Sequence, residues 1–261
     1  MLFFKRRKGS VPFQNCLLEA GKTVLFRRNA MSSGNVYETL FKQWASIGKL
    51  VLDNKRDPEE VSSILQAIIA GKRLVEAKPT LQEMLVDWTN FYKEVFGLDL
   101  DFSGIPIPDR KPGFDRLLVV AKGMTPQHLF DRCAELFPSW KYADKNLDEV
   151  IKSDRTSQNG HYAVWVRDRV EADEENKKLS ANDLKVRGGD EITAEERMLY
   201  ELKFFKETGQ HLDKTNWTLC VGSRDSGGSV PGAFWCSGEF GVGWYCASDC
   251  GDSLRSRSVV F

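Results

Sequence analysis

The sequence predicts an α+β protein, in which a helical N-terminal module precedes a mixed α/β domain that ends in antiparallel β-hairpins. Between about residues 35 and 97, apolar side chains recur with the period of an α-helix. Further along, short apolar runs alternate with capped helical segments. After residue 216, closely spaced glycines separate short aromatic and β-branched runs, a pattern typical of antiparallel hairpins.

Residues 1–34 form a basic head, which we interpret as a disordered or misassigned segment, with a functional arm as the alternative. Its first 30 residues hold seven Lys or Arg and one acid, Glu19, although the whole chain has 37 basic and 37 acidic residues. Polar residues interrupt the apolar stretch that a secretory signal needs. No apolar run reaches the length of a membrane span. We therefore expect a cytoplasmic protein that is not bound to a membrane.

Residues 35–97 are predicted to hold three helices that form a small bundle. Asp57 and Pro58 supply an N-cap and a proline at the first helical position of the second helix. Thr80 and Glu83 form a capping box for the third. The aromatic side chains of this module are interpreted as core residues.

A linker is predicted at residues 98–115, because this segment holds Pro106, Pro108 and Pro112 and cannot continue a helix. The domain boundary is placed here, so that residues 116–261 form the α+β domain with Gly-rich antiparallel strands at its C-terminal end.

Within that domain the pattern predicts a buried strand over 117–121, a helix after Thr125, and a central strand that begins near His161. A further helix is expected to begin after Thr193 and to end at Gly209, because Thr193 with Glu196 makes another capping box.

The run from His161 to Glu175 changes from an apolar strand pattern into a dense series of charges. Basic and aromatic side chains near the strand end can clamp or stack on an anionic ligand or another protein. The predicted binding residues are Arg155, Trp165, Arg167 and Arg169. The alternative is an ordinary strand end, at which these charges pair locally on the surface.

Asp168 and Glu171 are weak candidates for catalysis, as metal ligands or as an acid and base pair. They would suit a hydrolase acting on a phosphate-containing or nucleic-acid substrate. Alternatively, the acids that follow Arg169 occupy the first turn of a helix, where the dipole favours negative charge. No phosphate-binding glycine loop is present, and no cofactor is expected.

The four C-terminal cysteines are weak candidates for a zinc site, for which thiolates in close pairs are usual. Only the last two are close in the sequence, so no metal is expected and free, partly packed thiols are the main interpretation. These residues are Cys220, Cys236, Cys246 and Cys250.

Two further strings imitate known sites. Asp225-Ser226-Gly227-Gly228 resembles the nucleophile region of trypsin-like serine proteases, which makes a serine hydrolase a remote alternative. Glu201 and Lys203 imitate part of a metal-dependent nuclease site. Two residues apart on a helix they point to different sides, and a solvated helix surface explains them better.

Several longer strings, among them Gly113–Pro126, Val164–Glu174 and Leu254–Arg257, resemble a family of uncharacterised bacterial proteins. The resemblance runs from about Phe102 to Phe261 and implies an intracellular bacterial protein without an assigned activity. Because no motif meets the geometry that chemistry needs, we expect a non-enzymatic interaction or ligand-binding module.

Overall fold

The computed structural model describes residues 33–71 and 79–261, with side chains of the first helix from Glu38 onward. The predicted basic head lies almost wholly outside the described residues. The chain divides into two compact units, with residues 23–80 in one and residues 81–261 in the other. None of the helices in the described ranges is long and apolar enough to cross a lipid bilayer.

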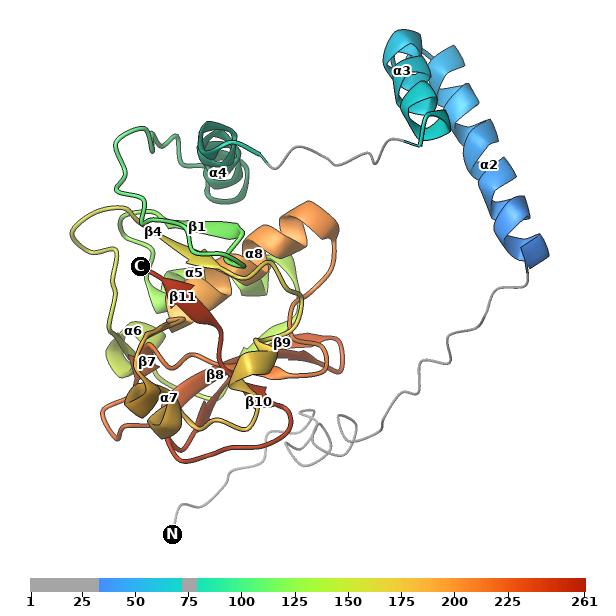
Figure 1. The fold of residues 1–261 in the computed structure, drawn as a ribbon. Helices are drawn as coiled ribbons and strands as arrows, with labels where there is room; N and C mark the ends of the chain where they lie inside the picture. The colour runs from blue at the N-terminus through green and yellow to red at the C-terminus, as the bar shows by residue number, and fades with distance from the viewer. Residues whose placement is uncertain (1–32, 72–78) are drawn as a thin grey trace. The chain divides into compact units, whose positions relative to one another are not determined.

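The first unit shows two helices, α2 (Ser33–Leu52) and α3 (Pro58–Ile69), joined by a short turn (Figure 1). The predicted cap of α3 is confirmed, since the Asp57 side chain accepts the Glu59 N–H at 3.0 Å. Burial in this hairpin is slight. Val51, Val61 and Leu65 are half-buried, and α3 has no buried residue.

The second unit is the mixed domain, and the chain as a whole is α+β, as predicted. Its helices are α4 (Leu81–Phe96), α5 (Pro126–Leu136), α6 (Leu147–Val150), the 3-10 turn η1 (Glu174–Asn176), α7 (Ala181–Arg187) and α8 (Ala194–Thr208). Its strands are β1 (Arg116–Val120), β2 (Ser139–Lys141), β3 (Lys152–Ser153), β4 (Tyr162–Val166), β5 (Asp190–Glu191), β6 (Trp217–Leu219), β7 (Ser223–Arg224), β8 (Val230–Cys236), β9 (Glu239–Tyr245), β10 (Leu254–Arg255) and β11 (Ser258–Val260).

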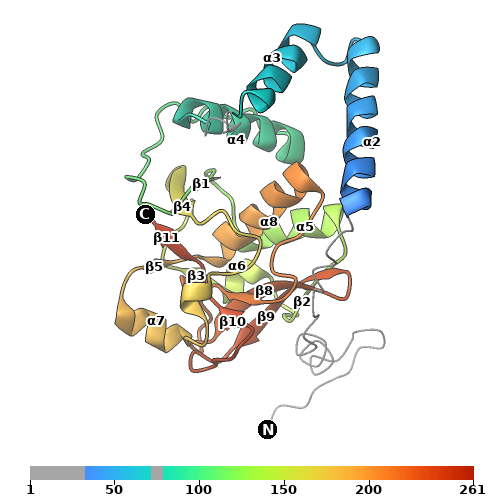
Figure 2. The ribbon, with the colours of Figure 1, turned by 45° about the vertical axis from the view of Figure 1, so that its right-hand side comes forward.

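These strands make two main sheets with α8 packed between them (Figures 1 and 2). One sheet has the antiparallel order β1-β4-β11-β5, so β4 is an inner strand, as expected. The other has the order β10-β6-β8-β9-β2, and its two outer pairs are parallel. A third, two-stranded sheet joins β3 to β7. Most of the apolar core is continuous from α4 through β1 and β4 to α8.

Helix α4 closes the free edge of β1. Trp88 Nε1 donates to the main-chain oxygen of Leu117 at 3.0 Å, and the Tyr92 hydroxyl donates to that of Val119 at 2.8 Å. The Ala121 N–H donates back to the Tyr92 hydroxyl at 2.9 Å. An edge strand exposes unpaired backbone groups, and here α4 supplies their partners.

The position of α4 corrects the predicted domain boundary. The sequence pattern grouped this helix with the two before it and placed a linker at 98–115. The structure instead places α4 in the unit that holds the sheets. Phe102 and Phe114, inside the predicted linker, are buried in the same core. Amphipathicity shows that a helix has a packing face, but it does not say which element covers that face.

The C-terminal hairpin predicted from the glycines is β8–β9, and Ser237 and Gly238 turn between its strands with positive φ. Gly241 in β9 leaves room for aromatic rings, because a Cβ there would lie 2.9 Å from both Phe234 and Trp140. The parallel pairing of the outer strands was not predicted.

Candidate functional site

The charged run after β4 was the predicted binding surface, and the structure changes the role of its tryptophan. Trp165 is 5 % exposed, and its Nε1 donates to the Pro108 main-chain oxygen at 2.9 Å. The Arg110 guanidinium lies 5.6 Å from the ring centroid. The ring therefore belongs to the core and is not open for stacking on a ligand.

Arg167 and Arg169 are both held by acids a few residues along the chain. Arg167 bonds Asp173, and its guanidinium lies 4.2 Å from the centroid of Phe114. Arg169 makes a bidentate pair with Glu175, at 2.6 and 3.0 Å. The hydrogen bonds from Arg169 lower the pKa of Glu175 to about 2. These local pairs correspond to the alternative interpretation of the charged run.

Arg155, the fourth predicted binding residue, is bound to a different set of acceptors. Its Nε and Nη2 donate to the two carboxylate oxygens of Glu196 at 2.8 and 2.9 Å, and Nη2 also donates to the Glu191 main-chain oxygen. Only 8 % of Arg155 is exposed. The four predicted binding residues therefore do not line one surface: two of them are buried, and their partners differ.

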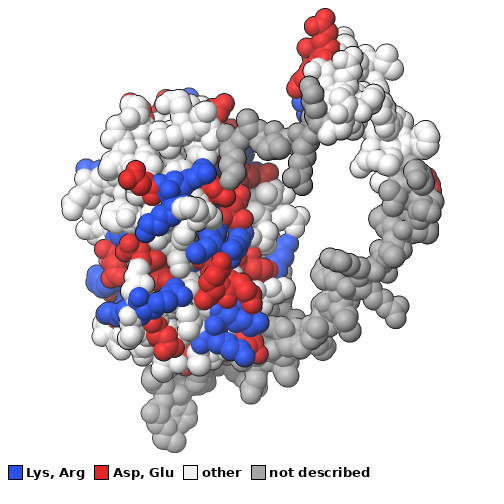
Figure 3. Space-filling view, in the orientation of Figure 1, with Lys and Arg blue, Asp and Glu red and all other residues white. Residues whose placement is uncertain are grey.

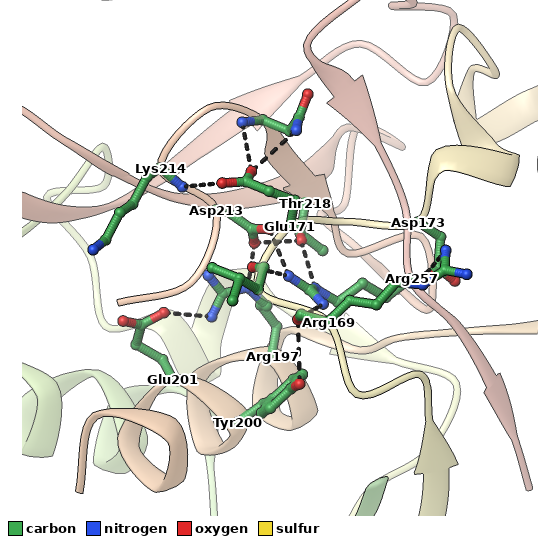
Figure 4. A network of polar contacts seen from close by, with 12 residues as sticks. Arg169, Glu171, Asp173, Arg197, Tyr200, Glu201, Asp213, Lys214, Thr218 and Arg257 are labelled. Carbon is green, nitrogen blue, oxygen red and sulfur yellow. Dashed lines mark hydrogen bonds and ion pairs between the residues drawn. The ribbon is translucent and has the colours of Figure 1, made fainter. Parts of the chain in front are cut away.

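Asp168 and Glu171 do not form an acid and base pair. The Asp168 carboxylate is half exposed and lies 3.8 Å from Arg116. The Glu171 carboxylate accepts the main-chain N–H groups of Lys214, Thr215 and Asn216 (Figure 4). Glu171 thus holds the loop before β6, a structural role that sequence spacing did not indicate.

Beneath this loop lies a network of buried charges that the sequence analysis missed (Figure 4). The centre of the network is Asp213, whose carboxylate bonds Arg197 Nε at 2.8 Å and Arg257 Nη2 at 2.6 Å. Arg197 Nη1 also donates to Glu201 at 2.8 Å, and the His211 ring lies 2.9 Å from the other oxygen of Glu201. All four charged side chains, those of Asp213, Arg197, Arg257 and Glu201, are at most 1 % exposed.

The position of α8 explains why these charges are buried. The helix packs between two sheets, so the polar residues of its first ten positions are buried, and a buried charge is tolerated only with a partner. The solvated surface expected for Glu201 and Lys203 is therefore wrong, since these residues are 0 % and 3 % exposed. The available signal was that Leu199 and Tyr200 lie among the charged positions of the helix, whereas an ordinary surface helix has a clean polar face.

A second buried acid lies at the start of α8, under the β3–β7 sheet. Ser153 Oγ donates to Glu195 Oε2 at 2.6 Å and lies 2.7 Å from Ser223 Oγ. The Ala194 N–H donates to Ser223 Oγ at 2.9 Å. Burial is the main cause that raises the pKa of Glu195 to about 7. The predicted capping box of Thr193 and Glu196 is confirmed, but nothing in the pattern indicated a buried acid with a raised pKa beside it.

The structure gives the cysteines different environments and places the protease-like string in a turn. Cys220 is a buried free thiol, and Cys246 and Cys250 are exposed free thiols, as interpreted from the sequence. Cys236 is disulfide-bonded, so the interpretation as a free thiol is wrong for this residue. Residues 33–71 and 79–261 hold no group of three or more His, Cys, Asp or Glu side chains that could bind a metal ion. Asp225, beside Ser226, accepts the N–H groups of Gly227 and Ser229 at 2.8 and 2.7 Å, so this carboxylate closes a turn.

The mixed domain has a shallow, open depression of about 500 Å³. Its lining is charged, and of the predicted binding residues it includes only Arg169. Basic and acidic side chains also interleave across the face of the mixed domain that Figure 3 shows. The depression is lined by Arg169, Glu171, Ala172, Glu174, Glu175 and Arg255.

Fold and site together define an α+β protein that has a helical hairpin and an open, charged depression without a metal cluster in the described residues. Searches of protein-family models, of curated proteins and of solved structures found no match to this chain.

Proposed function

We propose that this protein is a non-enzymatic interaction module that associates with a second copy of itself through the α2–α3 hairpin. The observation that carries the proposal is an apolar surface that both helices expose. Folded domains rarely leave large apolar side chains together in water unless another surface covers them. This surface, here called the hairpin face, consists of Leu40, Phe41, Trp44, Ile47, Ile64, Ile68 and Ile69, each 36 % exposed or more.

The mixed domain supports a binding role over a catalytic one. Its buried acids and bases are engaged with one another, and the acids proposed for hydrolysis have no common partner. Catalysis needs a nucleophile, acid or base that can reach a substrate. The hydrolase alternative has no comparable support.

A second copy fits the hairpin face for two reasons. Two helices alone leave half of each apolar stripe uncovered, whereas two hairpins can bury all four stripes in a four-helix bundle. The charges are also complementary. Helix α2 has two lysines and one glutamate, a net charge of +1, and α3 has two glutamates and no base, a net charge of −2. Placing α2 of one copy beside α3 of the other would pair opposite charges.

The test is the mass of the full chain in solution, measured by light scattering over a range of concentrations. We expect a dimer for the wild type and a monomer for Trp44→Lys, because a charge at the centre of the hairpin face cannot be buried without a partner. The matched control is Val186→Lys, which changes a side chain that is 88 % exposed in the other unit and should stay dimeric.

A wild type that is monomeric at every concentration would overturn self-association. A Trp44→Lys variant that remains dimeric would do the same. We also propose the bacterial origin and the cytoplasmic location that the sequence indicated. The fold is evidence for neither of them.

A further inference from the structure

Arg255 is the cation in the depression whose donors are least satisfied. Its side chain is 9 % exposed, and its one ion pair within the described ranges joins Nη1 to Glu174. Its Nε is buried and has no acceptor there. A guanidinium has five N–H donors, and leaving a buried donor unpaired is unfavourable.

Arg257 provides a comparison, because each of its guanidinium nitrogens has a hydrogen-bond acceptor. Arg257, two residues further along, is also buried, at 1 % exposed, and all three of its nitrogens donate. The acceptors are the Thr218 hydroxyl, the Asp213 carboxylate and the main-chain oxygens of Arg169 and Val170. Arg255 is therefore less fully paired than Arg257, and it lines a feature that is open to solvent.

The partners of the two arginines in the depression are adjacent residues on one short element. Glu174 pairs with Arg255 and Glu175 pairs with Arg169, and both acids lie on the 3-10 turn η1. Their side chains are 64 % and 49 % exposed. The residue before η1, Asp173, makes no side-chain capping bond to it. Both acids are exposed and can move into solvent, so an external carboxylate can compete for the guanidinium that each of them binds.

We propose that the depression binds a ligand with two neighbouring carboxylates, and that Glu174 and Glu175 occupy the site as internal competitors. The ligand carboxylates would replace them on Arg255 and Arg169, and bidentate pairing with guanidinium gives the preference for carboxylates. Two sources have this chemistry: an acidic peptide with adjacent glutamates and a small dicarboxylate. The inference does not depend on self-association.

The test compares binding of acetyl-Glu-Glu-amide and of succinate to the full chain by calorimetry. We expect Glu174→Gln/Glu175→Gln to bind at least one of them about tenfold more tightly than the wild type, because the competing carboxylates are gone. Adding Arg255→Gln to that variant should remove the gain. If this triple variant does not fold, Arg169→Gln replaces it, since Arg169 is 42 % exposed. If acetyl-Glu-Glu-amide binds more tightly, the ligand is an acidic peptide. If succinate binds more tightly, the ligand is a small dicarboxylate.

The control is Glu149→Gln/Glu239→Gln, which removes the same two charges from exposed positions outside the depression. This control should bind like the wild type. An equal gain in affinity in the control would mean that the tighter binding comes from the change in net charge, and it would overturn the proposal. So would the absence of any gain in Glu174→Gln/Glu175→Gln, or a gain that survives the loss of Arg255.

Discussion

The buried charged residues around Asp213 are brought together by the fold from segments that are distant in the sequence. Asp213 follows a helix that ends at Gly209, and Arg257 lies near the C-terminal end of the chain, yet the two side chains meet at 2.6 Å. Replacing a buried ion pair by apolar residues is often neutral, whereas removing one partner is costly. The network around Asp213 is therefore best understood as the means by which α8 is accommodated between two sheets.

At this scale Glu195 gives a prediction about pH. Its pKa is about 7 in the folded protein, above the ordinary value of 4.5, because burial disfavours the charged form. The proton is thus held more tightly in the folded state. The stabilisation is fully present below about pH 4.5 and is lost as the pH rises through 7.

We expect Glu195→Gln to have nearly the stability of the wild type at pH 4.5. At pH 8 the variant should be more stable by up to about 3 kcal/mol, from about 1.4 kcal/mol for each pKa unit. Urea unfolding of both proteins from pH 4.5 to 8 measures the difference. Glu149→Gln, an exposed acid, should show no such trend, and a flat difference for Glu195→Gln would contradict the assigned pKa.

Among the elements, α4 shows what a sequence pattern predicts and what it leaves open. Thr80 and Glu83 marked the start of a helix, and the structure has one over Leu81–Phe96. The pattern also placed aromatic residues on its inner face, and Trp88 and Tyr92 are buried there. The partner of that face is the edge of β1, which lies beyond the predicted linker and could not be inferred from helical periodicity.

We expect Tyr92→Phe to lower the free energy of unfolding by about 2 kcal/mol, since removing the hydroxyl leaves the Val119 oxygen and the Ala121 N–H without a partner. Burial raises the pKa of Tyr92, so the hydroxyl keeps its proton and can donate. Chemical denaturation measures the change. A loss below about 0.5 kcal/mol would mean that the edge of β1 does not depend on this bond.

For the whole molecule, the division into two units predicts where the chain can be cut. A fragment of residues 79–261 keeps α4 on the edge of β1 and should fold cooperatively. A fragment of residues 98–261, cut at the predicted linker, uncovers that edge and loses part of the core. We expect it to be soluble only in part and to unfold at a markedly lower temperature.

Circular dichroism and thermal unfolding of the two fragments test this division. Equal stability of both fragments would mean that the domain boundary lies in the linker predicted at residues 98–115. Failure of the longer fragment to fold would mean that the mixed domain needs residues before α4.

The sequence by itself determined the α+β class, the capped ends of α3, α5 and α8, the inner position of β4 and the β8–β9 hairpin. Capping, periodicity and turn residues act over a few positions, so these features can be read locally. Only the tertiary structure decided that α4 closes β1, that α8 is buried between sheets, and that Arg169 and Arg255 share one depression. Those outcomes depend on which surfaces meet across long stretches of chain, and a local pattern does not encode the partner.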